Sequence, residues 1–485
     1  MVARILPAFA MTSIRWFAPL GIVCFTRHLC YIWRNITSFL VAFGRIITVG
    51  KSVLALAVMC AIAGVVRAAE GSIEIYTILD DSVAHIEHSL PPSDVHTFGF
   101  NSYNIPGEDQ GSRWAVVSGA EQMSRYGLQG NETFSNGFSG FFKLEGAINS
   151  ASGQIANNGR SVLNNANTLS TISSASAING QAFSRAQYVG ISYPLAGSFE
   201  IGRTVAFSTE QVTEFDPLHA SGLYSPIGYS GTIGGGLGIT ENARLDNSVR
   251  YDNKIGPVSF GLQYKIGQTD SSEAADVGSA LEGMVAYHAG PFSVELAASK
   301  ARNTPSLSYK LFTNDVGLRV SDSFGGMLAA KYDFTPRGSI YAGVEHTDQT
   351  IPSGSNNWSA QITSYYNMPI AGLVTAKAFN STWGDAPIRV VWVGADYRFT
   401  DAFSLSVGYY NVDNEANSHN DQYTNQQFGI LPDYKFNAHF DVYAGLMFAH
   451  YTGAYLTQFL PINVATGNVI YGIGLRARIS KGLPF

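Results

Sequence analysis

The feature that most constrains the fold is a repeated plan of short segments in which apolar and polar residues alternate. From residue 247 onward the segments come in pairs, each joined by a turn of a few residues and separated from the next pair by a longer polar stretch. The pairs are 247–266, 281–300, 323–347, 358–380, 389–412 and 426–450. Alternation with a period of two is typical of a β-strand with two different faces. The sequence therefore predicts a series of antiparallel hairpins.

The same alternation is present before residue 247. In the first expected strand, 72–87, one face carries Ile73, Ile75 and Leu79, and the other carries Glu74, Tyr76 and Asp80. Further strands are expected at 124–132 and in the stretches FFKLEGAIN, QAFSRAQYVGIS and GSFEIGRTV. One opening strand, eight hairpins and one closing strand give a count of 18 strands.

Composition favours a membrane barrel over a soluble β-sandwich or solenoid, which is the alternative. Charged residues are 14% of the chain, against about 25% in soluble domains. No region after residue 68 contains the roughly 18 consecutive apolar residues that a membrane helix needs. Short turns on one side and long loops on the other are typical of an outer-membrane barrel, whose strands show one face to lipid and the other to water. We therefore predict an all-β fold, a transmembrane antiparallel β-barrel.

The end of the chain reads as the strand that closes this barrel. In YGIGLRARISKGLPF the apolar residues share one parity, which Lys481 interrupts, and Arg476 and Arg478 share the other. The apolar set is Tyr471, Ile473, Leu475, Ala477, Ile479, Leu483 and Phe485. An unpaired strand edge is not tolerated in lipid, so this last strand is expected to pair with the first.

A long segment at 204–240 interrupts the hairpin plan. It carries Glu210, Glu214 and Asp216 and then continues as a run rich in glycine and other small residues. Glu210 and Glu214 are four residues apart, so a single helical turn would place both on one face. A pore needs such an acidic loop if the loop folds inward to narrow it. We expect this segment to enter the lumen as the constriction of a water-filled barrel that spans residues 69–485.

Residues 1–68 are predicted to be a signal peptide that follows a misannotated or extra N-terminal extension. Lys51 precedes the apolar run SVLALAVMCAIAGVV, and Val66 and Ala68 are small enough for a signal-peptidase site. All three cysteines lie in this region, so the mature chain has no disulfide framework and no thiolate metal site. The remaining 36 acidic and 23 basic residues give a formal charge of −13, which argues against nucleic-acid binding.

Several stretches together resemble the Gram-negative general porins, most closely the trimeric porins of proteobacteria. They are SIEIYTILD, SRYGLQGNETFSNGFSGFFKLEGAIN, FSRAQYVGISYPLAGSFEIGRT, NSVRYDNKIGPVSFGLQY and the terminal GIGLRARI with its final phenylalanine. Each stretch alone is weak, but their order and spacing are specific. The resemblance implies 16 strands in most members, a third loop in the lumen, and a homotrimer embedded in outer-membrane lipid and lipopolysaccharide. We ascribe the two strands beyond 16 to the hairpin at 426–450.

The resemblance also implies which residues form the constriction, where barrel-wall arginines face carboxylates of the third loop. The matching residues are Arg125, Arg185, Arg203, Glu210 and Glu214, with Arg244, Arg250 and Asp216 as additional candidates. The helical face of Glu210 and Glu214 is expected to look toward Arg125 and Arg185. Strict alternation after Phe199 and Ile201 would point Arg203 at lipid, so a bulge is expected there.

The expected function is passive diffusion of small hydrophilic solutes and ions through the outer membrane. A solute-specific channel and an outer-membrane barrel enzyme are the alternatives. The mature histidines are scattered, His85 and His88 being the only close pair, and no G-x-S-x-G motif is present. We therefore predict no enzymatic activity, no cofactor and no metal site.

Signal cleavage gives the first testable prediction. We expect cleavage after Ala68, because the apolar run ends there in small residues. N-terminal sequencing of the protein from outer membranes should then begin at Ala69. A mature chain that begins before residue 50 would contradict this prediction.

Overall fold

The computed structural model divides into two units, Met1–Arg67 and Ala68–Phe485. It describes residues 68–87, 112–134, 136–151, 153–156, 182–226, 244–267, 279–310, 315–350, 387–414, 423–453 and 467–484. Except for Ala68, the predicted signal segment therefore lies outside the described residues. No helix in this described part is long and apolar enough to cross a membrane.

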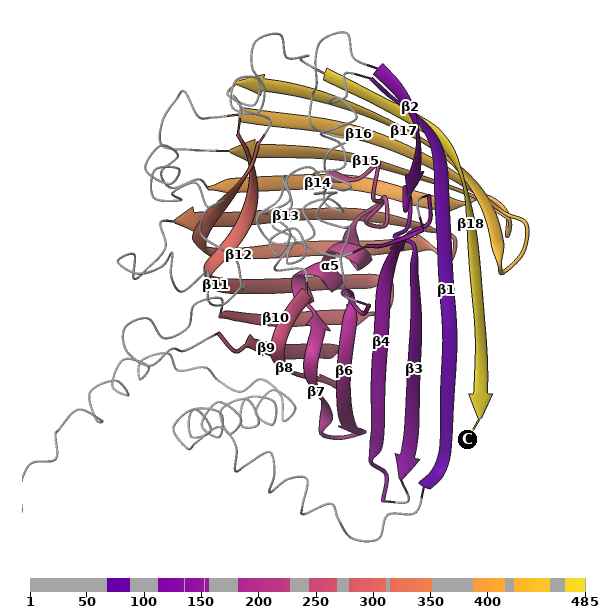
Figure 1. Ribbon diagram of the computed structural model, residues 1–485, viewed down its shortest axis with the longest axis vertical. Helices are drawn as coiled ribbons and strands as arrows, with labels where there is room; N and C mark the ends of the chain where they lie inside the picture. The colour runs from indigo at the N-terminus through magenta and orange to yellow at the C-terminus, as the bar shows by residue number, and fades with distance from the viewer. Residues whose placement is uncertain are drawn as a thin grey trace, which may run out of the picture. The chain divides into compact units, whose positions relative to one another are not determined.

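The second unit is one antiparallel sheet with a short helix at its inner face (Figure 1). The strands are β1 (Ala68–Glu87), β2 (Ser112–Ser118), β3 (Arg125–Phe134), β4 (Ser139–Asn149), β5 (Gln154–Ala156), β6 (Ala186–Tyr193), β7 (Gly197–Val205), β8 (Arg244–Ile255), β9 (Val258–Lys265), β10 (Ala280–Ala289), β11 (Phe292–Lys310), β12 (Asp315–Thr335), β13 (Gly338–Thr350), β14 (Ile388–Arg398), β15 (Phe403–Asn414), β16 (Tyr423–Lys435), β17 (Phe440–Gly453) and β18 (Gly467–Pro484). The helix is α5 (Phe207–Phe215).

The sheet closes on itself where the first strand meets the last. β1 pairs with β18 from Ser72 opposite Pro484 to Ile86 opposite Ile470. The other edge of β1 is shared, because β3 pairs with residues 68–78 and β2 with residues 81–87. β2 and β5 are only seven and three residues long, and the other strands form a closed barrel of 16. The predicted transmembrane barrel and its closing strand are confirmed.

The count of 18 placed one hairpin too many in the barrel wall. The hairpin predicted at 358–380 lies outside the described residues, and the wall continues past it because β13 pairs directly with β14, from Gly338 opposite Tyr397 to Thr347 opposite Ile388. Attributing the surplus to 426–450 was wrong, because that stretch forms most of β16 and β17. The alternation in sequence identifies strands but not which of them the closed wall includes.

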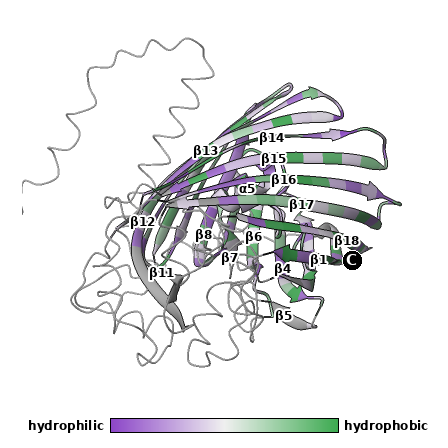
Figure 2. Cartoon of the chain, turned by 90° about the horizontal axis from the view of Figure 1, so that it is seen from above, coloured by the Kyte–Doolittle hydropathy of each residue, from purple (hydrophilic) through white to green (hydrophobic). Residues whose placement is uncertain are grey.

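Alternation along the strands follows the predicted parity (Figure 2). Ile75 and Leu79 of β1 are exposed on the outer face, whereas Asp80 of the same strand is buried. At the other side of the seam Ile473 and Leu475 are 63% and 65% exposed, while Arg476 is 4% exposed. Large apolar side chains exposed to this extent are expected where lipid replaces water outside the barrel.

Turns of two residues join several neighbouring strands at one end of the barrel. β8 and β9 are linked through Gly256, and β10 and β11 through Gly290, with φ angles of 60° and 57°. Two-residue hairpin turns need positive φ, which glycine adopts without steric cost. The short turns predicted there from the sequence are confirmed.

Aromatic rings gather beside the other turns at this end of the barrel, which join β12 to β13, β14 to β15 and β16 to β17. Tyr397 lies 6.2 Å from Phe334 and 4.9 Å from Phe399 between ring centroids, and Tyr434 lies 5.5 Å from Phe436. Membrane barrels carry such aromatic girdles at the boundary between lipid and water. The girdle marks where the turn end of the barrel reaches that boundary.

The bulge predicted near Arg203 is present. The register between β7 and β8 shifts between Gly202 and Thr204, and Gly202 has a φ of 140°. Phe199 and Ile201 before the shift are exposed on the outer face, whereas Arg203 is 8% exposed. The extra residue of this bulge lies in β8, where Asp246 and Asn247 together stand opposite Arg203, and Asn247 has a φ of 49°. The local bend of the bulge and the unusual backbone of Gly202 keep the guanidinium of Arg203 off the lipid face.

Candidate functional site

The segment after β7 leaves the wall and forms α5 against the inner faces of β10 to β13 (Figure 1). The N-cap residue Ala206 has no side chain that could accept a hydrogen bond from the first turn. Buried Glu282 of β10 does so instead, accepting bonds from the Phe207 N–H at 2.8 Å and the Ser208 hydroxyl at 2.9 Å. A carboxylate at a helix N-terminus also interacts favourably with the helix dipole. The wall therefore caps the helix.

One polar and several apolar side chains hold the middle of α5 to the wall. Gln211 donates from Nε2 to the carbonyl oxygens of Glu295 at 2.7 Å and Met327 at 3.3 Å. Val212 and Phe215 are buried on the same side. Because Glu295 and Met327 belong to β11 and β12, the helix bridges neighbouring strands and cannot slide along one of them.

Asp216 anchors the chain as it leaves the helix. Its carboxylate accepts hydrogen bonds from the Tyr410 hydroxyl at 2.5 Å, the Leu218 N–H at 3.2 Å and the Ala220 N–H at 2.7 Å. Burial raises the pKa of this carboxyl, and the Tyr410 hydrogen bond partly offsets the rise. Trp392 adds a bond from Nε1 to the Phe215 carbonyl at 3.1 Å.

The expectation that Asp216 lines the pore was therefore wrong. The residue is 0% exposed and its carboxylate points into loop and wall. The physical reason is that the backbone turns at Asp216 and leaves N–H groups to be satisfied in a buried place, which a carboxylate can do. Its position in the sequence, beside Glu210 and Glu214, does not indicate that its side chain is buried.

Side chains of α5 and of the loop after it pack onto glycines of the wall. A Cβ on Gly261 would lie 2.2 Å from the Phe207 ring, and one on Gly445 would lie 2.1 Å from the Tyr224 ring. Leu218 leaves only 2.4 Å at Gly429. These distances are far inside van der Waals contact, so the glycines allow the loop to lie directly on the strand backbone.

The acidic face of α5 is open on its other side. Glu210 and Glu214 have side chains that are each 45% exposed, as expected for two residues four apart on one helix face. Glu210 forms a bidentate pair with Arg250 of β8, at 2.7 and 2.9 Å. Glu214 lies 3.9 Å from Nδ1 of His288 on β10.

Arg250 is held on all sides. Besides Glu210, it bonds from Nε to Asp252 at 3.2 Å and from Nη1 to the Val205 carbonyl at 3.0 Å. Its guanidinium lies 4.1 Å from the centroid of the Phe207 ring. A cation over an aromatic face adds to the bidentate pair, so this charge has one well-defined position.

The other arginines lie at the same end of neighbouring strands. Arg125 begins β3, Arg185 directly precedes β6, Arg203 lies near the end of β7 and Arg244 begins β8. Arg203 bonds to the Ser184 carbonyl at 2.7 Å and pairs closely with Asp246. Half-buried Arg244 starts the strand that follows the loop.

Glu145 of β4 is the partner of the first two arginines. Its carboxylate lies 2.5 Å from Nε of Arg185 and 3.6 Å from Nε of Arg125, and it also accepts a bond from the Tyr76 hydroxyl at 2.6 Å. Lys143 lies 3.5 Å away. Within the described residues, Arg125 and Arg185 thus pair with this wall carboxylate and not with the acids of α5.

Four residues of this site were missed by the sequence reasoning: Glu145, Glu282, His288 and Glu295. The alternation in FFKLEGAIN, which places Glu145 on the polar face of its strand, was a signal for this residue. Glu282, His288 and Glu295 lie on the inner face of one predicted hairpin, and that shared face could have grouped them. No signal in the sequence showed that α5 would lie on this hairpin.

The comparison with protein families settles what kind of chain this is. A model described as Gram-negative porin matches residues 55–454. The chain belongs to the Gram-negative porin family. The resemblance inferred from the sequence motifs is confirmed. The porin is thus an outer-membrane β-barrel of a non-enzymatic channel family, which excludes the enzyme alternative.

Curated relatives and solved structures agree with this assignment. The porin is 26% identical to an outer membrane porin protein of Bordetella pertussis over 226 residues, 47% of this chain and 49% of that protein. It is 25% identical to outer membrane porin protein 32 of Delftia acidovorans over 254 residues, 52% of this chain and 60% of that protein. The chain thus spans about half the length of the curated relatives it matches.

Two solved structures share the fold. An anion-selective porin from Comamonas acidovorans has a TM-score of 0.59 at 18% identity, covering 84% of this chain and 100% of that one. OmpT of Vibrio cholerae, in a trimer form, has a TM-score of 0.53 at 15% identity, covering 85% of this chain and 100% of that one. At such identities the likeness concerns the barrel fold alone.

The anchoring of the loop gives a second prediction. Asp216→Ala removes the acceptor of three hydrogen bonds and leaves buried donors unpaired, each costing about 1–3 kcal/mol. We expect the loop to open locally while the barrel stays closed, so that limited proteolysis cuts within residues 207–226 at least about tenfold faster. Asp401→Ala, in an exposed turn between β14 and β15, is the control. An unchanged cleavage rate in Asp216→Ala would show that the other contacts hold the loop without Asp216.

Proposed function

We propose that this porin forms a water-filled channel for passive diffusion of small hydrophilic solutes and ions across the outer membrane. The observation that carries the proposal is the position of α5, which lies against the inner wall with Glu210 and Glu214 half-exposed. The similarity in fold to an anion-selective porin supports a channel function. Diffusion through such a channel requires neither a binding step nor an energy source.

We propose further that the acids of α5 and the arginines at the ends of β3, β6, β7 and β8 form a charged constriction. Opposed unit charges about 10 Å apart interact by roughly 0.4 kcal/mol at a dielectric constant of 80 and roughly 1.7 kcal/mol at 20. Several such pairs orient dipolar solutes and disfavour bulky or apolar ones. Ion pairing of Arg125 and Arg185 with Glu145 reduces the net positive charge of that side and fixes the positions of both guanidinium groups.

Ion selectivity tests the charged constriction. Replacing Glu210 and Glu214 together with Gln should raise anion permeability relative to cation permeability, because it removes two acids and leaves Arg250 without its bidentate partner. Arg125→Ala should act in the opposite direction. Reversal potentials in planar bilayers, measured at low ionic strength, report both changes, and both should shrink at 1 M salt, where the Debye length is about 3 Å.

Arg337→Ala is the matched control for these variants. Arg337 pairs with Asp401 at 3.0 Å in an exposed position at the turn end of the barrel, so its loss should leave selectivity unchanged. Equal reversal potentials in the wild type and in both constriction variants would mean that these residues do not control the ion path. Absence of any conductance in wild-type protein would argue against the channel itself.

We also propose that the protein is a homotrimer. The trimer form of OmpT, which shares the fold, supports this, as do the exposed apolar side chains of Val83, Ile473 and Leu475 around the seam. The family resemblance also implies that the loop 88–113 latches onto a neighbouring barrel, and residues 88–111 of this loop lie outside the described residues. Contact between barrels would bury such outward apolar surface.

Electrophoresis without heating tests the oligomeric state. We expect a band of about three times the monomer mass that collapses to a monomer on boiling, because β-barrel oligomers of this kind lose their contacts only when the sheet unfolds. A heat-modifiable monomer as the sole species before heating would contradict a stable trimer.

A further inference from the structure

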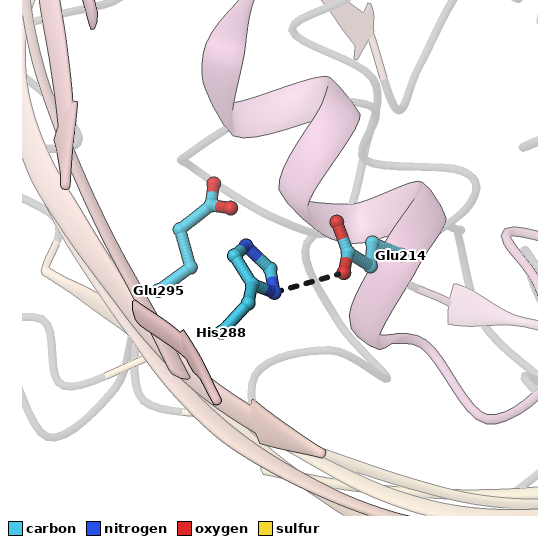
Figure 3. A group of neighbouring side chains, drawn as sticks. All are labelled: Glu214, His288 and Glu295. Atoms are coloured by element: carbon cyan, nitrogen blue, oxygen red, sulfur yellow. Dashed lines mark ion pairs between the residues drawn. The ribbon is translucent and has the colours of Figure 1, made fainter. Parts of the chain in front are cut away.

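A histidine and two carboxylates meet where α5 lies on the wall (Figure 3). Glu214 comes from the helix, His288 from β10 and Glu295 from β11. Their ligand atoms all lie within 4.8 Å of one another, and the two carboxylates lie on either side of the imidazole ring. Three separate elements thus each contribute one donor atom to a compact group.

Backbone pairing fixes two of the three donors. Ala286 is opposite Glu295 and Ser293 is opposite His288 in the register of β10 and β11, so His288 and Glu295 are diagonal neighbours on the inner face. The Ser293 hydroxyl lies 3.1 Å from Nδ1 of His288, which orients the ring. Gln211 bonds to the backbone carbonyl of Glu295, so the helix that supplies Glu214 is tied to the same residue.

Glu295 is a buried acid without a cation. The residue is 5% exposed, and within the described residues its carboxylate has no hydrogen bond and no ion pair. The nearby cation Arg250 is already occupied by Glu210 and Asp252. A carboxylate in a residue this deeply buried, with no partner, is incompletely solvated and therefore destabilised, and a cation bound beside it would relieve that cost.

A second group of acids on the inner wall shows the contrasting case. Glu121, Asp433 and Asp441 also lie within 4.8 Å of one another. Arg476 lies among them, at 2.6, 2.8 and 3.0 Å respectively. The protein itself supplies the cation there, whereas no lysine or arginine of the described residues pairs with Glu214 or Glu295.

We propose that Glu214, His288 and Glu295 bind a divalent transition-metal ion of the zinc type in the lumen. Imidazole nitrogens and carboxylate oxygens are both zinc ligands, and three protein ligands leave the fourth tetrahedral position for water. An imidazole ligand favours such ions over magnesium and calcium, which prefer oxygen donors alone. The site goes beyond passive diffusion, because the bound ion would place a fixed positive charge on the acidic face of the channel.

The three donors must move closer together to hold the ion. Ligands about 2.0–2.2 Å from a tetrahedral zinc ion are roughly 3.4 Å apart, whereas the donor atoms here lie within 4.8 Å of one another. Glu214 has a 45% exposed side chain and is free to rotate, whereas His288 and Glu295 are placed by the sheet. A rigid pair with one mobile donor leaves a path for the ion to enter from the lumen.

Zinc binding by the intact protein tests the proposal. Isothermal titration of the detergent-solubilised barrel with zinc chloride should show one site per chain that equimolar magnesium does not fill. His288→Asn and Glu295→Gln should each weaken this binding by about tenfold or more, since even residues that only support a metal ligand contribute about 10–100-fold. His346→Asn is the matched control, because His346 also lies beside a carboxylate, 3.2 Å from Asp348, but the described part of the chain offers no third donor there.

Two results would overturn the proposal: equal zinc affinity in the wild type and in both variants, or binding of magnesium as tight as that of zinc. Heat-modifiable mobility on electrophoresis verifies that each variant is a folded barrel, and Glu295→Gln keeps the size of the side chain it replaces. The titration involves no ionic current. A protein that binds zinc but does not conduct would therefore refute the channel function and leave the metal site standing.

Discussion

Closure of the backbone hydrogen-bond ladder is the constraint on which the rest of this structure depends. In lipid an unpaired N–H or C=O group costs several kcal/mol, so a membrane sheet must have no free edge. β1 and β18 meet this requirement by pairing over fifteen residue positions, from Ser72 to Ile86. Once the sheet is closed, one face of every strand must be apolar and the other is free to be polar. The lumen, its arginines and its acids all follow from that division.

The inner face also carries the helix α5, which belongs to the segment that leaves the wall after β7. α5 has little to hold it by itself, because its N-cap is alanine and its length is only nine residues. Contacts with the wall supply what it lacks: Glu282 caps it, Gln211 donates to backbone carbonyls of β11 and β12, and Asp216 accepts a hydrogen bond from Tyr410 of β15. Polar contacts inside the barrel thus fix a helix whose other face remains exposed to the channel.

Much of this could be predicted from the sequence because strand parity is local. The inward direction of Glu145, the outward direction of Ile473 and even the bulge that turns Arg203 follow from counting residues along one strand. Partner choice is not local. Glu210 pairs with Arg250 because of where α5 lies on the wall, and Arg185 pairs with Glu145 because of the register between β4 and β6. No single segment of the sequence reveals either arrangement. Asp216 is similar, since its burial depends on Tyr410 far along the chain. The prediction of a wall hairpin at 358–380 was wrong for the same reason. Alternation shows that a segment could form a strand but not which strand it would pair with.

The glycines beneath the loop have a consequence for exchanging parts between barrels. Phe207, Leu218 and Tyr224 rest where Gly261, Gly429 and Gly445 expose bare strand backbone. A wall with an ordinary side chain at such a position would push the loop off by more than an ångström, and this wall under a smaller loop would contain empty space. Loop grafting between porins should therefore succeed only when the matching glycines are transplanted with the loop. The loop and the strands beneath it therefore have to be exchanged together, although more than two hundred residues separate Tyr224 from Gly445.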